Sequence, residues 1–123
     1  MNIKKLNEAI EILKEDLGGA LVGTDIYGAH DGQSIAGFNS NPKACALLGK
    51  LVKQTAESFE NTGFPPLGRF LLYDLVDGMM AIAIPLGDHQ WGMLIDSTKA
   101  PLGLLLNVVL PKAIDTFEEA IAA

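Results

Sequence analysis

The sequence of 123 residues has one cysteine, no cluster of basic residues and no long apolar run. A lone Cys45 excludes an intramolecular disulfide framework and is typical of a reducing compartment. The nine lysines and arginines are scattered along the chain and outnumbered by 15 acidic residues, which gives a net charge of -6. This balance disfavours nucleic acid or an anionic membrane as the main partner, because both require clustered cations.

Segments that would carry the chain into a membrane are also lacking. The longest apolar run, residues 102–110, is far shorter than the ~20 residues of a spanning helix. Near the N-terminus, Glu8 and Glu11 interrupt the apolar residues, so no signal peptide is predicted. We therefore expect a cytoplasmic protein with no membrane insertion, folded as a single domain over residues 1–123.

Charged residues are scarce, whereas apolar residues are in excess. Charged residues make up 20% of the chain, and apolar residues make up 49% before the 13 glycines are added. Apolar residues and glycine together form about 45–50% of an ordinary domain. A domain of this size has limited interior for such an excess, so we expect apolar surface that a second copy of the chain covers.

The sequence also lacks an assembled catalytic site. A nucleophile requires a base within hydrogen-bond reach, and only Cys45 with His30 or His89 could form such a pair. We interpret Cys45 as an inert core residue, because it lies on the apolar side of a predicted helix. The pair Gly49-Lys50 is not part of a phosphate-binding loop, since no glycine precedes it at the required offset. We predict no catalytic residue, no cofactor and no metal.

Two small clusters leave weaker alternatives open. Three ligand-type side chains lie close together at a predicted turn: Asp25, His30 and Asp31. They could hold a divalent metal, although Asp and His are also common in exposed turns for purely local reasons. Three aromatic residues of predicted strands could stack a ligand: Phe70, Tyr73 and Trp91. Aromatic residues on strands more often belong to a core or an interface.

The first third of the chain predicts a helix and a hairpin. Apolar residues recur at steps of three and four over residues 3–17, and Gly18-Gly19 then ends this amphipathic helix. Two apolar segments, residues 20–26 and 34–38, flank a glycine-containing turn over residues 27–33. This arrangement is typical of an antiparallel β-hairpin.

A second helix is predicted from Asn41-Pro42 to about residue 61, because Asn is a good N-cap and proline suits the first helical position. Its apolar arc covers about 180° of the helical wheel, wider than the ~100° stripe needed for docking on one surface. The helix should therefore contact both its own sheet and a neighbour. The arc consists of Ala44, Cys45, Leu47, Leu48, Leu51, Val52, Thr55, Ala56 and Phe59.

The last part of the chain predicts a three-stranded meander and a long helix. The strands are expected over residues 69–76, 79–85 and 90–96, and the first turn is the Asp77-Gly78 pair. Weak polar alternation predicts helices on both faces of the sheet. The final helix is expected to be capped by Ser97 and Thr98, buried on most sides from Leu102 to Leu110, and kinked at Pro111.

With this order of elements, the chain resembles the roadblock family, small modules related to dynein light chains and to bacterial regulators of Ras-like GTPases. The resemblance covers almost the whole chain, and longin-like and profilin-like domains share parts of its pattern. It is carried by residues 18–25, by residues 32–37, by the Asp77-Gly78 hairpin and by the apolar final helix. It implies an α/β fold of the α+β sandwich type with one five-stranded antiparallel sheet in the order 2-1-5-4-3. The first and last helices would lie on one face and the second helix on the other.

The resemblance also implies a dimer in which the third strands pair and the second helices pack together. The residues that would form this interface are Leu48, Leu51, Thr55, Phe59, Arg69, Phe70 and Leu72. The implied function is a non-enzymatic interaction module, a homodimer that regulates or serves as adaptor for a Ras-like small GTPase or a larger complex. Since Arg69 is the only arginine and lies on the dimer edge, the sequence gives little support to an arginine finger acting on a GTPase.

Two other functions remain open at the level of sequence. A small-molecule sensor of the PAS or profilin-like type would place Trp91 and the glycine-containing strands around a pocket. A metal-dependent enzyme would use the Asp25, His30 and Asp31 cluster. Neither the identity of a partner nor the choice between homodimer and heterodimer follows from the sequence.

Overall fold

The structure is a computed structural model that describes all residues 1–123. Its helices are α1 (Ile3–Leu17), α2 (Pro42–Thr62), α3 (Leu102–Leu104) and α4 (Leu110–Ala122). Its strands are β1 (Leu21–Gly28), β2 (Ser34–Phe38), β3 (Leu71–Asp74), β4 (Met79–Leu86) and β5 (His89–Asp96). Short 3-10 turns cover Gly18–Ala20 and Val76–Gly78, and a π turn covers Leu105–Val109.

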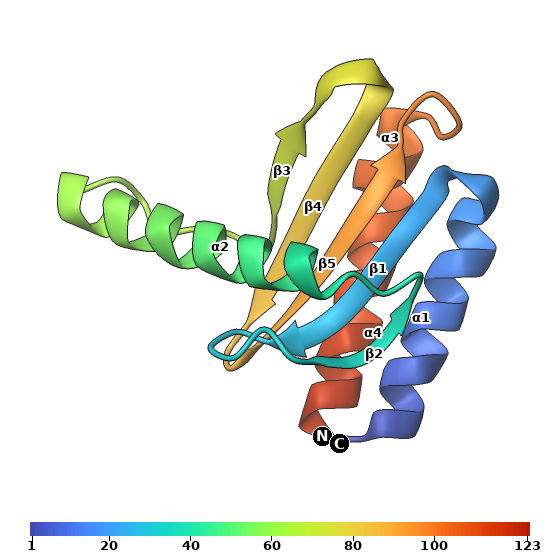
Figure 1. The fold of residues 1–123 in the computed structure, drawn as a ribbon, viewed down its shortest axis with the longest axis horizontal. Helices are drawn as coiled ribbons and strands as arrows, with labels where there is room; N and C mark the ends of the chain where they lie inside the picture. Colours follow the sequence, from blue (N-terminus) through green and yellow to red (C-terminus); the bar gives the residue numbers. More distant parts are fainter.

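The five strands form one antiparallel sheet in the order β2-β1-β5-β4-β3. Helices α1 and α4 pack side by side on one face, and α2 crosses the other face at a steep angle to the strands (Figure 1). The predicted α+β sandwich, its strand order and the distribution of its helices are therefore confirmed.

The main core lies between the sheet and the α1/α4 layer. It contains 23 buried residues, and at its centre the Trp91 ring meets Phe117 edge-on with ring centroids 5.7 Å apart. The Trp91 indole Nε1 donates a hydrogen bond to Thr24 Oγ1 at 2.7 Å, which satisfies the one polar atom of this fully buried side chain. Trp91 therefore belongs to the core, as is usual for an aromatic residue on a strand, and it does not line the pocket that the alternative sensor function would require.

The strands differ from the sequence prediction mainly at their ends. Strand β1 continues through Tyr27 and Gly28, whereas β3 is limited to four residues and omits Arg69 and Phe70. Between β3 and β4, Asp77 and Gly78 have φ values of 62° and 76°. Two successive residues with positive φ form the tight turn that an Asp-Gly pair favours, so this hairpin prediction is confirmed.

The last helix differs more strongly from the prediction. Ser97 and Thr98 do not cap it: Ser97 Oγ donates to the Gly78 carbonyl at 2.6 Å, and the Thr98 hydroxyl donates to Asp96 Oδ1 at 2.5 Å. The helix begins after Pro101, and the π turn Leu105–Val109 directly precedes the turn that contains Pro111. Proline cannot donate a backbone N–H to the helix. The π turn therefore appears where the sequence predicts a kink at Pro111.

The prediction that residues 102–110 are buried on most sides is wrong. Leu105, Val109 and Leu110 are buried, but three other large apolar side chains are about half exposed, at 50%, 45% and 54%: Leu102, Leu104 and Val108. The sheet is covered by one side of this segment only, so an all-round apolar sequence leaves apolar surface outside. No helix of the chain is both long enough and apolar enough to cross a bilayer.

Candidate interaction surface on the α2 face

Helix α2 has well-defined ends, as the sequence predicted. At its start, the Asn41 side chain accepts a hydrogen bond from the Ala44 N–H at 3.2 Å, and Pro42 occupies the first turn. At its end, Gly63 has the left-handed conformation with φ of 73°, and its N–H returns to the carbonyls of Phe59 and Glu60. A helix of 21 residues is about 31 Å long.

Only the first half of α2 is held by its own sheet. Its buried residues are Cys45, Leu48, Gly49 and Val52. After Val52 no residue of the helix is buried, and the C-terminal half projects past β3 into solvent (Figure 1). We call residues 53–64 the overhang. The sheet thus covers one part of the predicted wide apolar arc. The chain leaves the other part of the arc uncovered.

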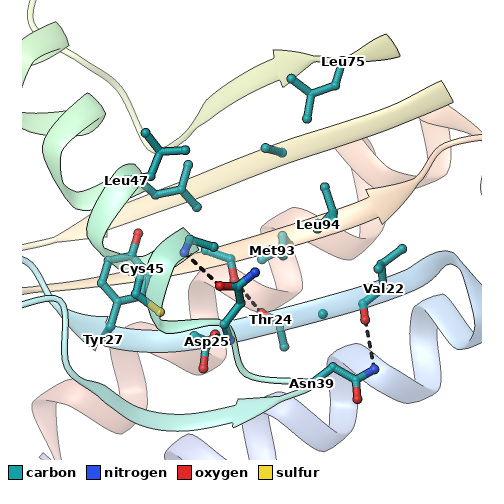
Figure 2. A pocket seen from close by; sticks show the side chains of 16 residues that line it. Val22, Thr24, Asp25, Tyr27, Asn39, Cys45, Leu47, Leu75, Met93 and Leu94 are labelled. Atoms are coloured by element: carbon teal, nitrogen blue, oxygen red, sulfur yellow. Dashed lines mark hydrogen bonds between the residues drawn. The ribbon is translucent and has the colours of Figure 1, made fainter. Parts of the chain in front are cut away.

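A groove lies beside α2 on the same face of the sheet. It has a volume of about 360 Å³ and is bordered by the first turns of α2, by β1 and β5, and by the end of β3 (Figure 2). Three apolar side chains at its rim are 40%, 56% and 42% exposed: Val22, Leu47 and Leu75. Small residues, Ala81 and Gly92, contribute to its lining. The groove is therefore an uncovered and largely apolar part of the sheet.

Asp25 anchors the end of the groove where α2 begins. Its carboxylate is only 5% exposed and accepts hydrogen bonds from Ser34 Oγ at 2.7 Å, from Ser40 Oγ, and from the Asn41 N–H at 2.9 Å. A side chain at position 37 would collide with Asp25 Oδ1, which explains Gly37 in β2. Asp25 thus joins β1, β2 and the start of α2, and its oxygens are already engaged by donors of the protein.

The structure does not assemble the metal cluster considered from the sequence. The Asp25 carboxylate is held by the two serines and the backbone N–H at the start of α2. Asp31 Oδ1 instead accepts a hydrogen bond from the Gln33 N–H at 3.0 Å. His30 Nε2 lies 3.7 Å from Asp88 Oδ1, and both side chains are exposed. No three His, Cys, Asp or Glu side chains are grouped so that they could hold a metal ion. Asp25 lies within β1, whereas His30 and Asp31 lie in the turn after it, so their side chains have different partners.

Cys45, the nucleophile considered from the sequence, is a buried residue of α2 that packs with Tyr27 and Leu48. Burial, and then the nearby Asp25 charge, raise the pKa of the Cys45 thiol to about 12. A thiol that stays protonated near neutral pH is a poor nucleophile. Burial also raises the pKa of Tyr27 above its usual range. Three buried polar atoms on this face make no hydrogen bond to the protein: Tyr27 Oη, Tyr73 Oη and Gln90 Oε1.

The residues predicted for a dimer interface lie on α2, near the β3 edge of the sheet, and on the opposite face of the sheet. Leu48 is buried at 9% exposure and packs with Tyr27 and Cys45 inside the chain, so it offers little surface to a partner. Leu51, Thr55 and Phe59 are partly exposed along α2. Near the free edge of the sheet, Arg69 is exposed, while Phe70 and Leu72 are half-buried against the core under α1 and α4.

Sequence reasoning did not identify the groove or the end of the overhang. The Phe64 side chain is 62% exposed and its ring packs on Phe59 with centroids 5.6 Å apart. The sequence predicts Leu75 and Val22 within strands of a sheet that helices cover on both faces, so neither is expected at the rim of a groove. Small residues at alternate positions of β4, Ala81 and Ala83, are the sequence signal that a helix lies close to this face.

Comparison with known proteins identifies the fold. No family model and no curated protein matches the sequence. Among solved structures, Myxococcus xanthus MglB has a TM-score of 0.81 at 14% identity, covering 98% of this chain and 90% of that one. The gliding protein MglB from Thermus thermophilus has a TM-score of 0.78 at 14% identity, with 98% and 92% covered. A roadblock/LC7 domain from Streptomyces avermitilis has a TM-score of 0.72 at 9% identity, with 95% and 98% covered. The chain therefore has the roadblock-type fold.

Proposed function

We propose that this chain is a non-enzymatic, dimeric interaction module that regulates a Ras-like small GTPase. The observation that carries the proposal is the presence of two complementary features on one face: a helix that projects past β3 and an apolar groove beside that helix. Each feature is unpartnered within a single chain. A second copy can supply a partner to both at once, because a twofold interface uses the same surface from each subunit.

The geometry of such a dimer follows from the position of α2. A twofold axis normal to the sheet and next to β3 would place the two β3 strands side by side as one continuous sheet. The same rotation would carry the partner's overhang to the part of this sheet that α2 leaves bare, where the groove lies (Figure 1). From Val52 to Thr62 the helix rises about 15 Å, enough to cross about three strands spaced 4.8 Å apart.

The edge of β3 favours pairing. Its four residues, Leu71–Asp74, include no lysine or proline that would block strand addition, and Arg69 lies just before the strand. Two exposed apolar side chains flank β3 in the sequence: Phe64 at the end of the overhang and Leu75 directly after the strand. Their burial in a dimer would remove the apolar surface that the composition predicted.

The regulatory part of the proposal rests on the roadblock-type fold and on the lack of an assembled catalytic site. Arg69 is the only arginine and would lie at the dimer edge, so it would not be free to enter the nucleotide site of a GTPase. The dimer would act by binding and ordering the loops of the GTPase. An adaptor role in a larger complex would use the same dimer.

The test compares wild-type protein with Phe64→Asp in sedimentation experiments. Because Phe64 is exposed in the single chain, the substitution should leave the fold intact but place a charge in the dimer groove. We expect a wild-type dimer and a mostly monomeric Phe64→Asp variant. The matched control is Ile3→Asp, since Ile3 is 53% exposed on α1, on the other side of the sheet. A monomeric wild-type protein, or a Phe64→Asp dimer of unchanged affinity, would contradict the proposal.

The second arm measures single-turnover GTP hydrolysis and nucleotide release by a Ras-like GTPase from the same organism. The wild-type dimer should change one of these rates, the Phe64→Asp monomer should not, and Arg69→Ala should retain most of the effect if it remains dimeric. A rate that never responds to the dimer would restrict the chain to an adaptor role and refute regulation of that GTPase.

A small-molecule sensor is a second candidate function, favoured by one observation. The groove volume of about 360 Å³ lies within the range of ligand pockets, and its lining includes Tyr27, whose buried hydroxyl has no protein partner. Thermal-shift measurements on the monomeric Phe64→Asp variant, with a panel of small apolar metabolites, test this function. A saturable rise in melting temperature would support it, and no rise with any compound would argue against it.

A further inference from the structure

A second cavity lies between α2 and the turn that joins β1 to β2. It has a volume of about 280 Å³, and its lining comes from residues 29–32 of the turn and from residues 45–53 of α2. We call this cavity the turn pocket. In Figure 1 the turn lies below α2, whereas the end of β3 that borders the groove lies above it. The turn pocket and the groove are therefore on opposite sides of the same helix.

Small residues hold the turn against α2. Gly32 has a φ of 66°, and a Cβ built on it would lie 3.4 Å from Ala46 Cα. One helical turn later, a Cβ on Gly49 would lie 3.4 Å from the Ala29 carbonyl oxygen. The Ala29 N–H donates to the Asp88 carbonyl at 2.8 Å, which ties the turn to the connection between β4 and β5. The walls of the pocket are thus backbone surfaces that packing and a hydrogen bond keep in place.

Two lysines without a partner line the turn pocket. Lys50 and Lys53 are exposed and form no ion pair, whereas three other lysines of the chain each pair with a carboxylate. The lining contains one carboxylate, that of Asp31. This carboxylate accepts the Gln33 N–H and lies against Gly28, where a Cβ would collide with its Oδ1. The pocket therefore has two positive charges with which no carboxylate of the chain pairs.

A buried amide without a partner lies beside the same pocket. Gln90 is 4% exposed, and its Oε1 makes no hydrogen bond to the protein. This oxygen is 3.9 Å from the position that a Cβ on Gly49 would occupy, between α2 and the sheet. A half-turn of the amide would present its N–H donors at the same place. Since buried polar groups usually have a partner, the amide is a candidate donor for an anion that enters beside Gly49.

We propose that the turn pocket binds a phosphate group, either free phosphate or the phosphate monoester of a small molecule. A phosphate monoester has a charge of about -1.5 to -2 at pH 7, which matches the two positive charges. Lys50, Lys53 and the Gln90 amide supply three donors for its oxygens, and lysine binds phosphate as a point charge. The site lies along the middle of a helix, so it uses side chains and not the N–H groups of a glycine-rich loop.

Acidic residues on both sides of the pocket limit the size of the anion. Glu57 and Glu60 follow the two lysines on the same side of α2, since all four residues lie within about 80° of the helix circumference. Beyond the turn, Asp88 Oδ1 lies 3.7 Å from His30 Nε2. Nucleic acid or an anionic lipid surface would meet these carboxylates, whereas a single phosphate group would not. Because the proposed dimer uses the groove side of α2, the turn pocket stays open in the dimer as well.

The test follows binding by NMR at constant ionic strength and pH 7. The probes are inorganic phosphate and glycerol 3-phosphate, which distinguish free phosphate from a monoester, and the dipeptide acetyl-Glu-Glu-amide is the carboxylate probe. We expect at least one phosphate probe to shift the signals of the pocket residues and the side-chain amide signals of Gln90 in a saturable way. The shifts should be the same in the wild type and in Phe64→Asp. The double variant Lys50→Gln with Lys53→Gln should bind that probe roughly tenfold more weakly.

The matched control is Lys4→Gln with Lys5→Gln, which removes the same charge from two exposed lysines of α1 and should leave phosphate affinity unchanged. Without phosphate, both double variants should melt like the wild type, since all four side chains are exposed. The proposal is overturned if neither phosphate probe gives saturable shifts, if the control weakens binding equally, or if acetyl-Glu-Glu-amide binds as tightly as phosphate. It is also overturned if Lys50→Gln with Lys53→Gln changes the sedimentation of the protein, because the two lysines would then contact a second copy.

Discussion

Replacing Asp25 with alanine tests whether this carboxylate holds β1, β2 and the start of α2 together. The side chain is 5% exposed and accepts three hydrogen bonds, from two serine hydroxyls and one backbone N–H. Without the carboxylate, these donors lose a charged acceptor. The Asp25 oxygen that leaves no room for a side chain at position 37 is also removed. The first turn of α2, which borders the groove, should become less well fixed.

The magnitude follows from the donors. A hydrogen bond to a charged group contributes about 1.5–3 kcal/mol. Ser34 and Ser40 are themselves exposed, so their hydroxyls can turn to water and recover part of the loss. We therefore expect Asp25→Ala to lower the free energy of unfolding by about 3 kcal/mol, near one kcal/mol per donor. Asp25→Asn keeps the shape but presents an amide to a donor, and it should lose about 1–2 kcal/mol.

Urea denaturation followed by circular dichroism measures these differences, at one protein concentration because the stability of a dimer depends on it. Asp31→Ala is the matched control, since Asp31 is exposed in the same hairpin and accepts one backbone N–H at 3.0 Å. It should cost less than about 1 kcal/mol. The reasoning fails if Asp25→Ala is no more destabilising than Asp31→Ala.

Further predictions concern the layer beneath α2. Gly92→Ala should lower the free energy of unfolding by about 1–3 kcal/mol in urea titrations, because its Cβ would lie 2.7 Å from Leu48 Cδ1 and 3.1 Å from Tyr27 Cε1. The control Gly103→Ala has open space around it and should be neutral or stabilising by up to about 1 kcal/mol. Tyr27→Phe removes a hydroxyl without a protein partner and should leave the unfolding free energy within about 0.5 kcal/mol of wild type, so a loss above about 1.5 kcal/mol would show that this hydroxyl is hydrogen-bonded. Cys45 should react with iodoacetamide at pH 8 on the order of a thousandfold more slowly in the folded than in the urea-unfolded chain, because a pKa of about 12 leaves little thiolate. Since this pKa is raised on folding, the thiol's effect on stability should be absent below the unfolded thiol's pKa and destabilising as the pH rises above it, which pH-dependent melting would detect.

Local signals in the sequence predicted most of the fold. The stop at Gly18-Gly19, the Asn41-Pro42 start of α2 and the Asp77-Gly78 turn act over a few residues, so their chemistry fixes the local backbone without reference to distant residues. The errors occurred where neighbours in space decide. Ser97 is a good cap by type, but its hydroxyl is taken by the Gly78 carbonyl of an adjacent hairpin.

The candidate site was predictable only in part. The wide apolar arc of α2 indicated a second contact, and the structure places the uncovered part on a helix that projects past the sheet. The groove could not be predicted, because its rim combines residues from β1, α2 and the end of β3, which are far apart in sequence. Trp91 and Leu104 show the same limit, since their exposure depends on which side of the sheet each element covers.

The sequence by itself determined the order of helices and strands, the absence of a recognisable catalytic motif and the excess of apolar surface, because each follows from residue type and short-range periodicity. Only the tertiary structure decided where that apolar surface remains: on the overhang and groove of the α2 face, and at Leu102, Leu104 and Val108 of the last helical segment. The physical reason is that burial is a property of packing between elements. Periodicity gives the apolar side of a helix, but the width of the sheet and the angle at which α2 crosses it determine how much of that side is covered.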